Sequence, residues 1–201
     1  PNAIKGEKCK ILILKTTTSH AFAKLLEVIN PSKKRLETDC ITYKRCGGCN
    51  LRHMKYDATL ELKTNIVQNL VNRNLENKII VKPTIGMDKP YHYRNKAQYP
   101  IGYDNEGNII TGVFANRTHE IIPMVECKIQ QPIAEHIVKL IVNFLNENNI
   151  SAYEEKTGKG IFRHVVIKIG QVSKEIMCIL VINGEKFAKE QELVEYLKHN
   201  F

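Results

Sequence analysis

The alternation of apolar and polar residues divides the chain into strand-like and helix-like stretches. Apolar runs at residues 9–15 and 19–29 predict two strands near the beginning of the sequence, which is too little sheet for an independent domain. Between residues 57 and 74, apolar side chains recur every three or four positions, and this spacing predicts a helix with Asp57 as its candidate cap. The apolar stripe of this helix comprises Leu60, Leu62, Ile66, Val67, Leu70 and Val71.

The second half of the sequence combines further strands with two amphipathic helices. Strands are predicted at residues 91–100, 109–115 and 161–169, with a hairpin turn at residues 104–108. Residues 176–182 are apolar throughout, which predicts a buried central strand. Helical periodicity begins at Pro132 and again at Phe187. These elements together predict an α+β fold.

Three of the six cysteines, Cys40, Cys46 and Cys49, lie within ten residues in the spacing C-x5-C-G-G-C. The glycine pair before Cys49 permits a tight turn that brings the last two thiols towards a common centre. Converging thiolates suit zinc or an iron–sulfur cluster, and Cys127 is the best candidate for a remote fourth ligand. Zinc modules usually carry two C-x-x-C pairs, so the single pair here favours a cluster. A redox pair or two unrelated buried thiols stay open as readings of the C-x-x-C pair alone.

The charge balance favours a polyanionic partner. The chain of 201 residues has 30 Lys and Arg against 21 Asp and Glu, a formal net charge of +9. Nucleic acid is favoured over a membrane because no predicted helix pairs a basic face with an aromatic apolar one. No apolar run has the length of a membrane span, and no signal peptide opens the sequence. Clustered cysteines fit a reducing compartment, so we expect a cytoplasmic protein that contacts no membrane.

Two basic regions are candidates for contact with RNA. Lys33, Lys34 and Arg35 form one triplet shortly before the cysteines, although most such triplets are solvated surface turns. The stretch at residues 91–100 alternates aromatic rings with cationic and amide side chains, as an RNA-reading strand would. A half-buried strand with tyrosines inside is the alternative interpretation. The candidate RNA-binding residues are Lys33, Lys34, Arg35, Arg94, Asn95, Lys96, Gln98 and Arg117. His164, in a later strand, is expected to be structural.

Several familiar catalytic patterns are missing from the sequence. It contains no G-x-G-x-x-G or Walker-type loop, and no Cys–His or paired-carboxylate arrangement marks a catalytic site. The residues alone therefore indicate a basic, cluster-bearing, RNA-binding α+β protein, with no catalytic or organic-cofactor site of its own.

Motifs in a fixed order along the chain carry a family resemblance. They include the C-x5-C-G-G-C run, the segment Tyr91-x-Tyr93-Arg94-Asn95-Lys96-x-Gln98, Arg117-x-x-His119-Glu120-Ile121, Glu126-Cys127 and Arg163-His164-Val165. In these features the chain resembles the RumA-type 23S ribosomal RNA (uracil-5-)-methyltransferases, which form 5-methyluridine in RNA. The resemblance implies that Cys40, Cys46, Cys49 and Cys127 hold a [4Fe–4S] cluster.

The resemblance also implies a domain organisation and partners. Residues 1–30 would be the end of a TRAM domain, a small OB-like RNA-binding barrel, and residues 31–201 a mixed α/β central domain with the iron–sulfur site. The S-adenosylmethionine-binding domain, with the catalytic cysteine and base, would follow residue 201. The helix at residues 57–74 would pack on that domain, and without it part of the apolar stripe would be exposed or covered by a second copy of the chain. Periodicity alone leaves open that the helix packs wholly within these 201 residues. The expected substrate is RNA, in particular 23S ribosomal RNA.

Two other function classes compete with this interpretation. One is a self-contained iron–sulfur or zinc RNA-binding protein without transferase activity. The other is an electron-transfer protein, which is disfavoured because nothing in the sequence marks a surface for a redox partner.

Overall fold

The computed structural model describes residues 2–75, 79–123 and 126–200. The chain forms two compact units, each built from two separate segments. Unit 1 consists of Pro1–Asp39 and Cys49–Pro90, and unit 2 consists of Cys40–Gly48 and Tyr91–Phe201. The domain boundary expected after residue 30 does not coincide with a border between these units and stays a prediction.

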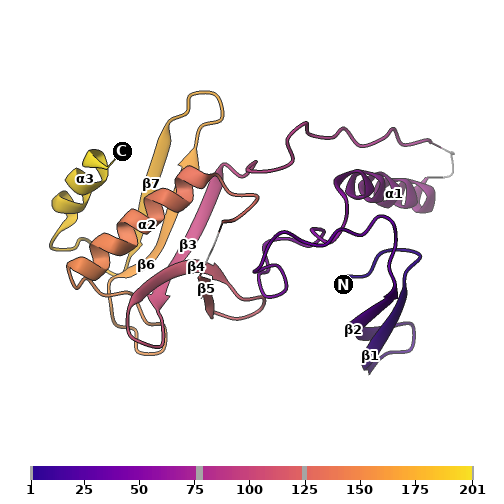
Figure 1. Cartoon of the computed structure of the whole chain (residues 1–201), viewed down its shortest axis with the longest axis horizontal. Coiled ribbons are helices and arrows are strands. Elements are labelled where there is room, and N and C mark those ends of the chain that lie inside the picture. Colours follow the sequence, from indigo (N-terminus) through magenta and orange to yellow (C-terminus); the bar gives the residue numbers. More distant parts are fainter. Residues whose placement is uncertain (1, 76–78, 124–125, 201) are drawn as a thin grey trace. The chain divides into compact units, whose positions relative to one another are not determined.

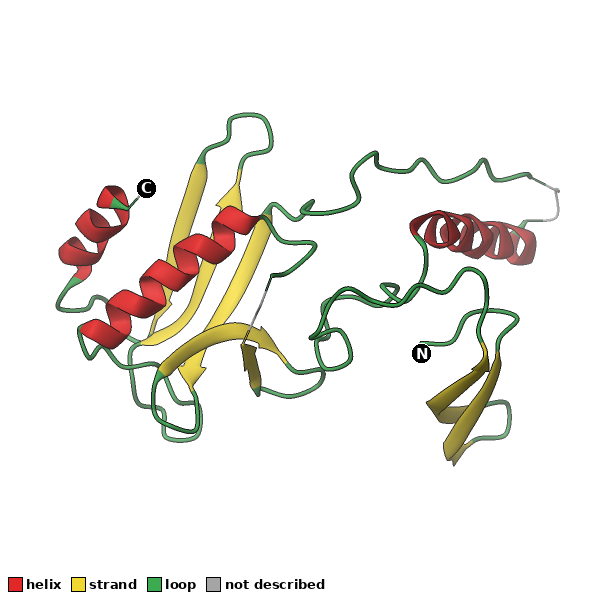
Figure 2. Ribbon diagram, in the orientation of Figure 1, coloured by secondary structure: helices red, strands yellow, loops and turns green. Residues whose placement is uncertain are grey.

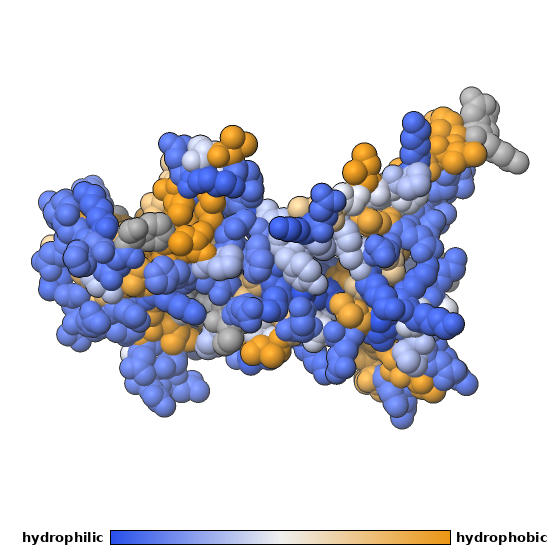
Figure 3. All heavy atoms as spheres, turned by 45° about the horizontal axis from the view of Figure 1, so that its top comes forward, coloured by the Kyte–Doolittle hydropathy of each residue, from blue (hydrophilic) through white to orange (hydrophobic). Residues whose placement is uncertain are grey.

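Unit 1 begins with a two-stranded antiparallel hairpin, β1 (Lys8–Thr16) and β2 (Ala21–Asn30), which confirms both strands predicted there. Its surface is strongly apolar: Leu14 is 64% exposed and Phe22 is 53% exposed. Figure 3 shows an apolar, orange area at the lower right, over the hairpin. The described residues form no closed barrel around the hairpin, so its derivation from a TRAM domain remains a hypothesis.

Helix α1 (Tyr56–Asn74) follows in unit 1, with bounds close to the predicted ones. Asp57 lies inside the first turn rather than at the cap, where Lys55 makes no side-chain hydrogen bond. A negative side chain in the first turn still favours the helix, because the helix dipole is positive there. Ala58 packs with Ile4 and Met54 in a small buried cluster.

The apolar stripe of α1 is only partly covered. Leu62 packs against the small buried cluster of unit 1, whereas Ile66 is 51% exposed and Leu70 is 53% exposed. The helix instead contacts the loop that follows it through polar groups, since Thr64 and Thr84 share a hydrogen bond of 2.8 Å. Exposure of part of the stripe, which the sequence-based hypothesis requires, is thus confirmed. What covers it stays a prediction.

Unit 2 contains a five-stranded sheet, antiparallel throughout, with the strand order β5-β4-β3-β6-β7. Figures 1 and 2 show helix α2 lying across one face of this sheet. The elements are β3 (Lys96–Tyr103), β4 (Ile109–Phe114), β5 (Ile121–Pro123), α2 (Pro132–Glu147), β6 (Phe162–Ile169), β7 (Ile176–Ile182) and α3 (Glu190–His199). The predicted turn at residues 104–108 is confirmed, with Gly107 in the left-handed region that favours glycine.

The core of unit 2 lies between the sheet and α2. Alternate residues of β3, namely Ala97, Tyr99 and Ile101, are buried on this face. Val138, Ile141 and Leu145 of α2 are almost fully enclosed and belong to the same cluster. We call this side of the sheet the covered face and the opposite side the open face. Because side chains alternate along a strand, every second residue of β3 must point to the open face.

Strand β7 corrects one prediction. Its apolar run indicated a central strand, but β7 is at the edge of the sheet. Met177 is 57% exposed, and Ile179 and Val181 are each 36% exposed. These three alternate residues share the open face, whereas Leu180 packs against the core on the covered face. The side chains of β7 are thus apolar on both faces of the sheet, but those that pack against the core lie on the covered face.

Candidate nucleic-acid interface and metal centre

The open face of the sheet carries two lysines directly opposite each other. Lys96 of β3 pairs in register with Lys168 of β6, and both residues are exposed. Like charges opposite each other on neighbouring strands are unfavourable, so the pair costs stability unless an anion lies between them. Lys96 was predicted as an RNA contact and Lys168 was missed, because only the strand register places Lys168 beside it.

A cavity of about 340 Å³ brings three predicted RNA-binding residues together. Arg94, Lys96 and Gln98 line it, and the Arg94 guanidinium donates to the carbonyl oxygen of Gly48 at 3.2 Å. Gln130 also lines the cavity and is 4% exposed; among the described residues its Oε1 atom has no hydrogen-bond partner. We call this space the sheet cavity. It combines cationic donors with an unsatisfied acceptor, which suits a polar, anionic ligand with hydrogen-bond donors.

Asn95 and Arg117 are exposed at two other places in unit 2. Asn95 lines a further cavity of about 570 Å³ together with Lys96, Lys168, Ser173 and the acidic Glu175. Arg117 lies in the turn between β4 and β5, with its backbone in the left-handed region at a φ of 62°. Asn95 therefore extends the surface around the two lysines, and Arg117 presents its charge from a turn.

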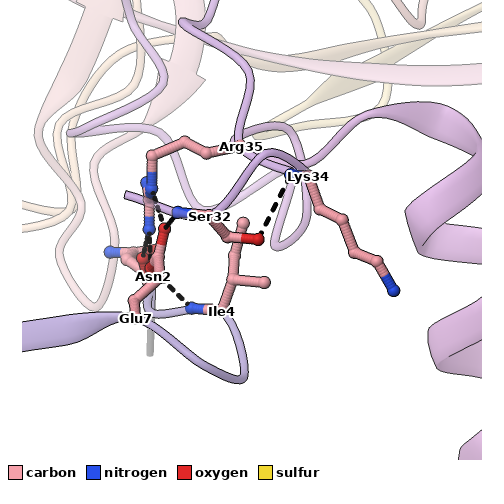
Figure 4. Close-up of polar contacts among 6 residues, drawn as sticks. All are labelled: Asn2, Ile4, Glu7, Ser32, Lys34 and Arg35. Carbon is pink, nitrogen blue, oxygen red and sulfur yellow. Dashed lines mark hydrogen bonds and ion pairs between the residues drawn. The ribbon is translucent and has the colours of Figure 1, made fainter. Parts of the chain in front are cut away.

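The basic triplet belongs to unit 1 and is largely engaged by acidic groups. The Arg35 guanidinium makes two contacts of 2.6 Å with the Glu7 carboxylate, whose side chain is fully enclosed. Figure 4 shows this pair together with the Ser32 and Ile4 backbone amides, which donate to Glu7. The hydrogen bond from Arg35 lowers the pKa of Glu7 from 4.5 to about 2.

The two lysines of the triplet differ from each other. Lys34 pairs with Glu61 of α1 while both side chains stay half exposed, so that pair contributes little to stability. Lys33 lies exposed in the turn before it. The triplet thus contains one structural anchor, one weak surface pair and one exposed cation.

The segment with the clustered cysteines is held against the sheet of unit 2. Cys46 forms a backbone bridge with Ala115, and the Asn116 amide donates to the Arg45 carbonyl at 2.8 Å. The Gly48 amide donates to Cys46 Sγ at 3.3 Å. A Cβ at Gly48 would lie 3.3 Å from that sulfur, so a larger residue would crowd the thiol.

The remaining predicted ligands lie in different surroundings. Cys40 Sγ lies 3.4 Å from the Thr42 hydroxyl. The Cys127 amide donates to the buried Glu135 carboxylate of α2 at 2.7 Å, which fixes the backbone at that cysteine. Cys49 follows Gly48 directly and is counted with unit 1. Cys40, Cys46 and Cys127 all belong to unit 2.

The donors fit a thiolate-bound group by their chemistry. Four cysteines provide the soft sulfur ligands that zinc or a cubane cluster requires. Among the described residues, no three Cys, His, Asp or Glu side chains are grouped closely enough to hold a metal ion. The predicted ligand set therefore rests on residue type and spacing.

The described helices include none with both the length and the apolar character to cross a membrane.

Comparisons with known proteins connect the chain to RNA methyltransferases. No known protein-family description matches it. It is 42% identical to an uncharacterized RNA methyltransferase of Staphylococcus epidermidis over its whole length, and 38% identical to another from Halalkalibacterium halodurans over 97% of its length. The chain spans only 44% and 43% of these relatives. It is therefore similar to the N-terminal portion of RNA methyltransferases.

A solved structure shares the fold. The crystal structure of Pyrococcus abyssi tRNA (uracil-54, C5)-methyltransferase in complex with S-adenosyl-L-homocysteine matches 93% of this chain with a TM-score of 0.62. The match covers 40% of that protein at 20% sequence identity, so it establishes the fold alone.

Proposed function

We propose that these 201 residues are the RNA-binding part of an S-adenosylmethionine-dependent methyltransferase that forms 5-methyluridine in RNA, with 23S ribosomal RNA as its substrate. The catalytic cysteine, the general base and the S-adenosylmethionine site would belong to a further domain in the same polypeptide. Support comes from the similarity to RNA methyltransferases at 42% identity and from the shared fold with an enzyme that modifies uracil in tRNA.

The observation that carries the RNA-binding role is the sheet cavity. Arg94, Lys96 and Gln98 line one space, with the unsatisfied Gln130 acceptor among them and Lys168 beside Lys96. Lysine and arginine contact phosphates, whereas glutamine can pair with base edges. Asn95 and Arg117 would add contacts around this surface. In unit 1, Lys33 is the residue best placed to contact phosphate, because Lys34 and Arg35 already pair with carboxylates.

The cysteines would hold a [4Fe–4S] cluster in this proposal. Cys40, Cys46, Cys49 and Cys127 supply four thiolates, and when bound such a group would supply either a rigid cross-link or a redox centre. Protein isolated without oxygen should then contain about four iron and four sulfide per chain. Cys46→Ser should lose both iron and sulfide, whereas stoichiometric zinc without sulfide would exclude the cluster.

The exposed part of the α1 stripe would be the contact with the methyltransferase domain. Ile66, Val67 and Leu70 are each about half exposed, and patches of this kind recruit a partner. In a longer polypeptide that includes the domain, amides of α1 should exchange hydrogen more slowly than in the 201-residue chain. Self-association of the shorter chain through the same stripe is the expected alternative.

RNA binding and substrate choice are tested together by competition. The 201-residue chain should bind a labelled 23S ribosomal RNA fragment at low salt, and unlabelled 23S fragments should compete better than tRNA or duplex DNA. The longer polypeptide should transfer a labelled methyl group from S-adenosylmethionine to the same fragment. If tRNA competes better and is methylated more than the 23S fragment, the substrate would be tRNA and not ribosomal RNA. Absence of RNA binding would refute the proposed function.

A further inference from the structure

A second cavity, of about 580 Å³, lies beside the sheet cavity in unit 2. The two spaces share Pro100, Phe114 and His164 in their walls, so they form one continuous surface at the end of the open face. Sequence reasoning gave Phe114 no role and assigned His164 to structure. We call this second space the aromatic groove.

Three rings in the aromatic groove form an ordered group. The Phe114 ring stacks with His119 at a centroid distance of 5.4 Å and an interplanar angle of 30°. The His164 ring meets the edge of Phe114 at 6.2 Å and 80°. Glu155 lies 2.5 Å from His119 Nδ1 and so restrains the histidine ring. Phe114 and His164 come from the strands β4 and β6, which fix the spacing of these two rings, whereas His119 comes from the turn between β4 and β5.

A second flat surface completes the aromatic groove. The Arg163 guanidinium lies over the Tyr153 ring, 4.6 Å from its centroid. This cation–π contact places a planar cation and an aromatic ring together in the wall of the groove. The groove therefore has planar π surfaces on more than one wall.

Exposure separates this group from ordinary core packing. Phe114 is 36% exposed, and the His119 side chain is 73% exposed. Rings that serve only to fill a core lose most of their accessible surface, as Phe162 and Tyr99 do in this unit. The open rings therefore have surface to offer a ligand.

The charges in the groove select the kind of ligand. Among the described residues, four carboxylates line it against two cations, Lys156 and Arg163, so negative charge predominates and disfavours phosphate; the carboxylates are those of Asp104, Glu120, Glu154 and Glu155. Glu120 and Glu155 already contact Arg45 and His119, and the remaining acceptor sites of the carboxylates can bond the amino and imino groups of a nucleobase. Planar rings with acceptors around them therefore suit a base, while the lysine pair nearby suits the phosphates on either side of it.

We propose that the aromatic groove stacks one unpaired base of the RNA whose backbone lies on the open face. This inference rests on the proposed RNA-binding function and adds to it a requirement for a single-stranded segment. Because base–aromatic stacking is tolerant of sequence, the groove would select unpaired structure more than base identity.

The test uses a short single-stranded RNA with the fluorescent base 2-aminopurine at successive positions. At one position the native chain should quench the fluorescence, and an abasic sugar there should weaken binding roughly 5- to 150-fold, the range expected for one stacked base. Phe114→Leu keeps an apolar side chain but removes the ring, and it should weaken binding of the intact RNA similarly. With the abasic RNA, Phe114→Leu should have no further effect.

Val172→Ala is the control, because Val172 is an apolar side chain of unit 2 that is 95% exposed and lines neither the sheet cavity nor the aromatic groove. It should leave quenching and affinity unchanged. Salt-dependent binding without quenching at any position, or equal binding of intact and abasic RNA, would overturn the proposal that the groove stacks a base, while the proposed function would stand. If the chain binds no RNA even at low salt, both proposals fail. The abasic RNA comparison uses native protein, so it decides the matter even if Phe114→Leu does not fold.

Discussion

The positive charges of two basic regions of this molecule have opposite surroundings. Arg35 in unit 1 is held by the enclosed carboxylate of Glu7, and the neighbouring Lys34 pairs with Glu61. Lys96 and Lys168 on the open face of unit 2 lie opposite each other instead. In a sequence both regions look like candidate RNA contacts. In the structure, Arg35 and Lys34 are paired with carboxylates, whereas the lysines of the open face lie opposite each other and repel.

The difference indicates which charges contribute to folding and which are available for binding. A guanidinium that neutralises an enclosed carboxylate stabilises the fold, and withdrawing it would leave that carboxylate uncompensated. A pair of like charges on a sheet has no such structural benefit. Among the described residues that line the cavity beside Lys96 and Lys168, Glu175 is the one carboxylate, so a net positive charge is left for an outside partner. Phosphate groups are the matching partner for a protein with a net charge of +9.

The largest expected effect comes from breaking the unit 1 pair. Arg35→Met should destabilise unit 1 by about 2 to 3 kcal/mol, because Glu7 would stay enclosed without its cation. Chemical denaturation followed by circular dichroism measures this loss. Lys34→Met is the matched control and should cost less than about 1 kcal/mol, since its pair with Glu61 is exposed. Equal losses for the two variants would show that enclosure of Glu7 is not what matters.

The same pair predicts a loss of stability in acid. The pKa of Glu7 is lowered from 4.5 to about 2 in the folded protein, so below pH 4.5 the unfolded chain takes up a proton more readily than the folded one. The stabilisation is complete above pH 4.5 and should disappear as the pH falls towards 2, with a slope of at most about 1.4 kcal/mol per pH unit. Arg35→Met should flatten this dependence. An unchanged acid limb in the variant would contradict the assignment to Glu7.

The smallest change in stability, and one of opposite sign, is expected on the open face. Lys96→Met or Lys168→Met should stabilise unit 2 by about 0.2 to 1 kcal/mol, because each removes the repulsion. The double variant should gain no more than either single one, since the repulsion needs both charges. RNA binding should weaken at the same time, with the salt slope reduced by about 0.7 for each lost phosphate contact to a single strand. Lys139→Met, on an exposed position of α2, should change neither property.

Local periodicity accounts for most of the elements that were predicted correctly. The apolar runs of β1, β2 and β7, the turn before β4 and the proline at the start of α2 are all signals within a few residues. The strand order is not such a signal. The apolar sequence of β7 is the same whether its open side is buried or exposed, so its place at the sheet edge could not be read from it.

The candidate site divides in the same way. Arg94, Lys96 and Gln98 were found because they are adjacent in sequence and alternate with aromatic residues. Lys168 and Gln130 were missed because only pairing with distant segments brings them beside that strand. The ion pair of Arg35 was not predicted for a related reason. Its partner Glu7 lies 28 residues earlier, and no short-range pattern connects an isolated glutamate to an arginine at that separation.

Along strand β3, residues that pack in the core alternate with residues of the proposed RNA-binding face, and this alternation restricts which mutations the protein can tolerate. Ala97 and Tyr99 belong to the covered face, whereas Lys96 and Gln98 belong to the open face. Loss or gain of a single codon within this stretch would exchange the two sets, so lysine and glutamine would enter the core and tyrosine would meet solvent. Point substitutions can alter one property at a time, but an insertion or deletion here removes both. We therefore expect the length of this strand to be inherited unchanged even where its residues diverge.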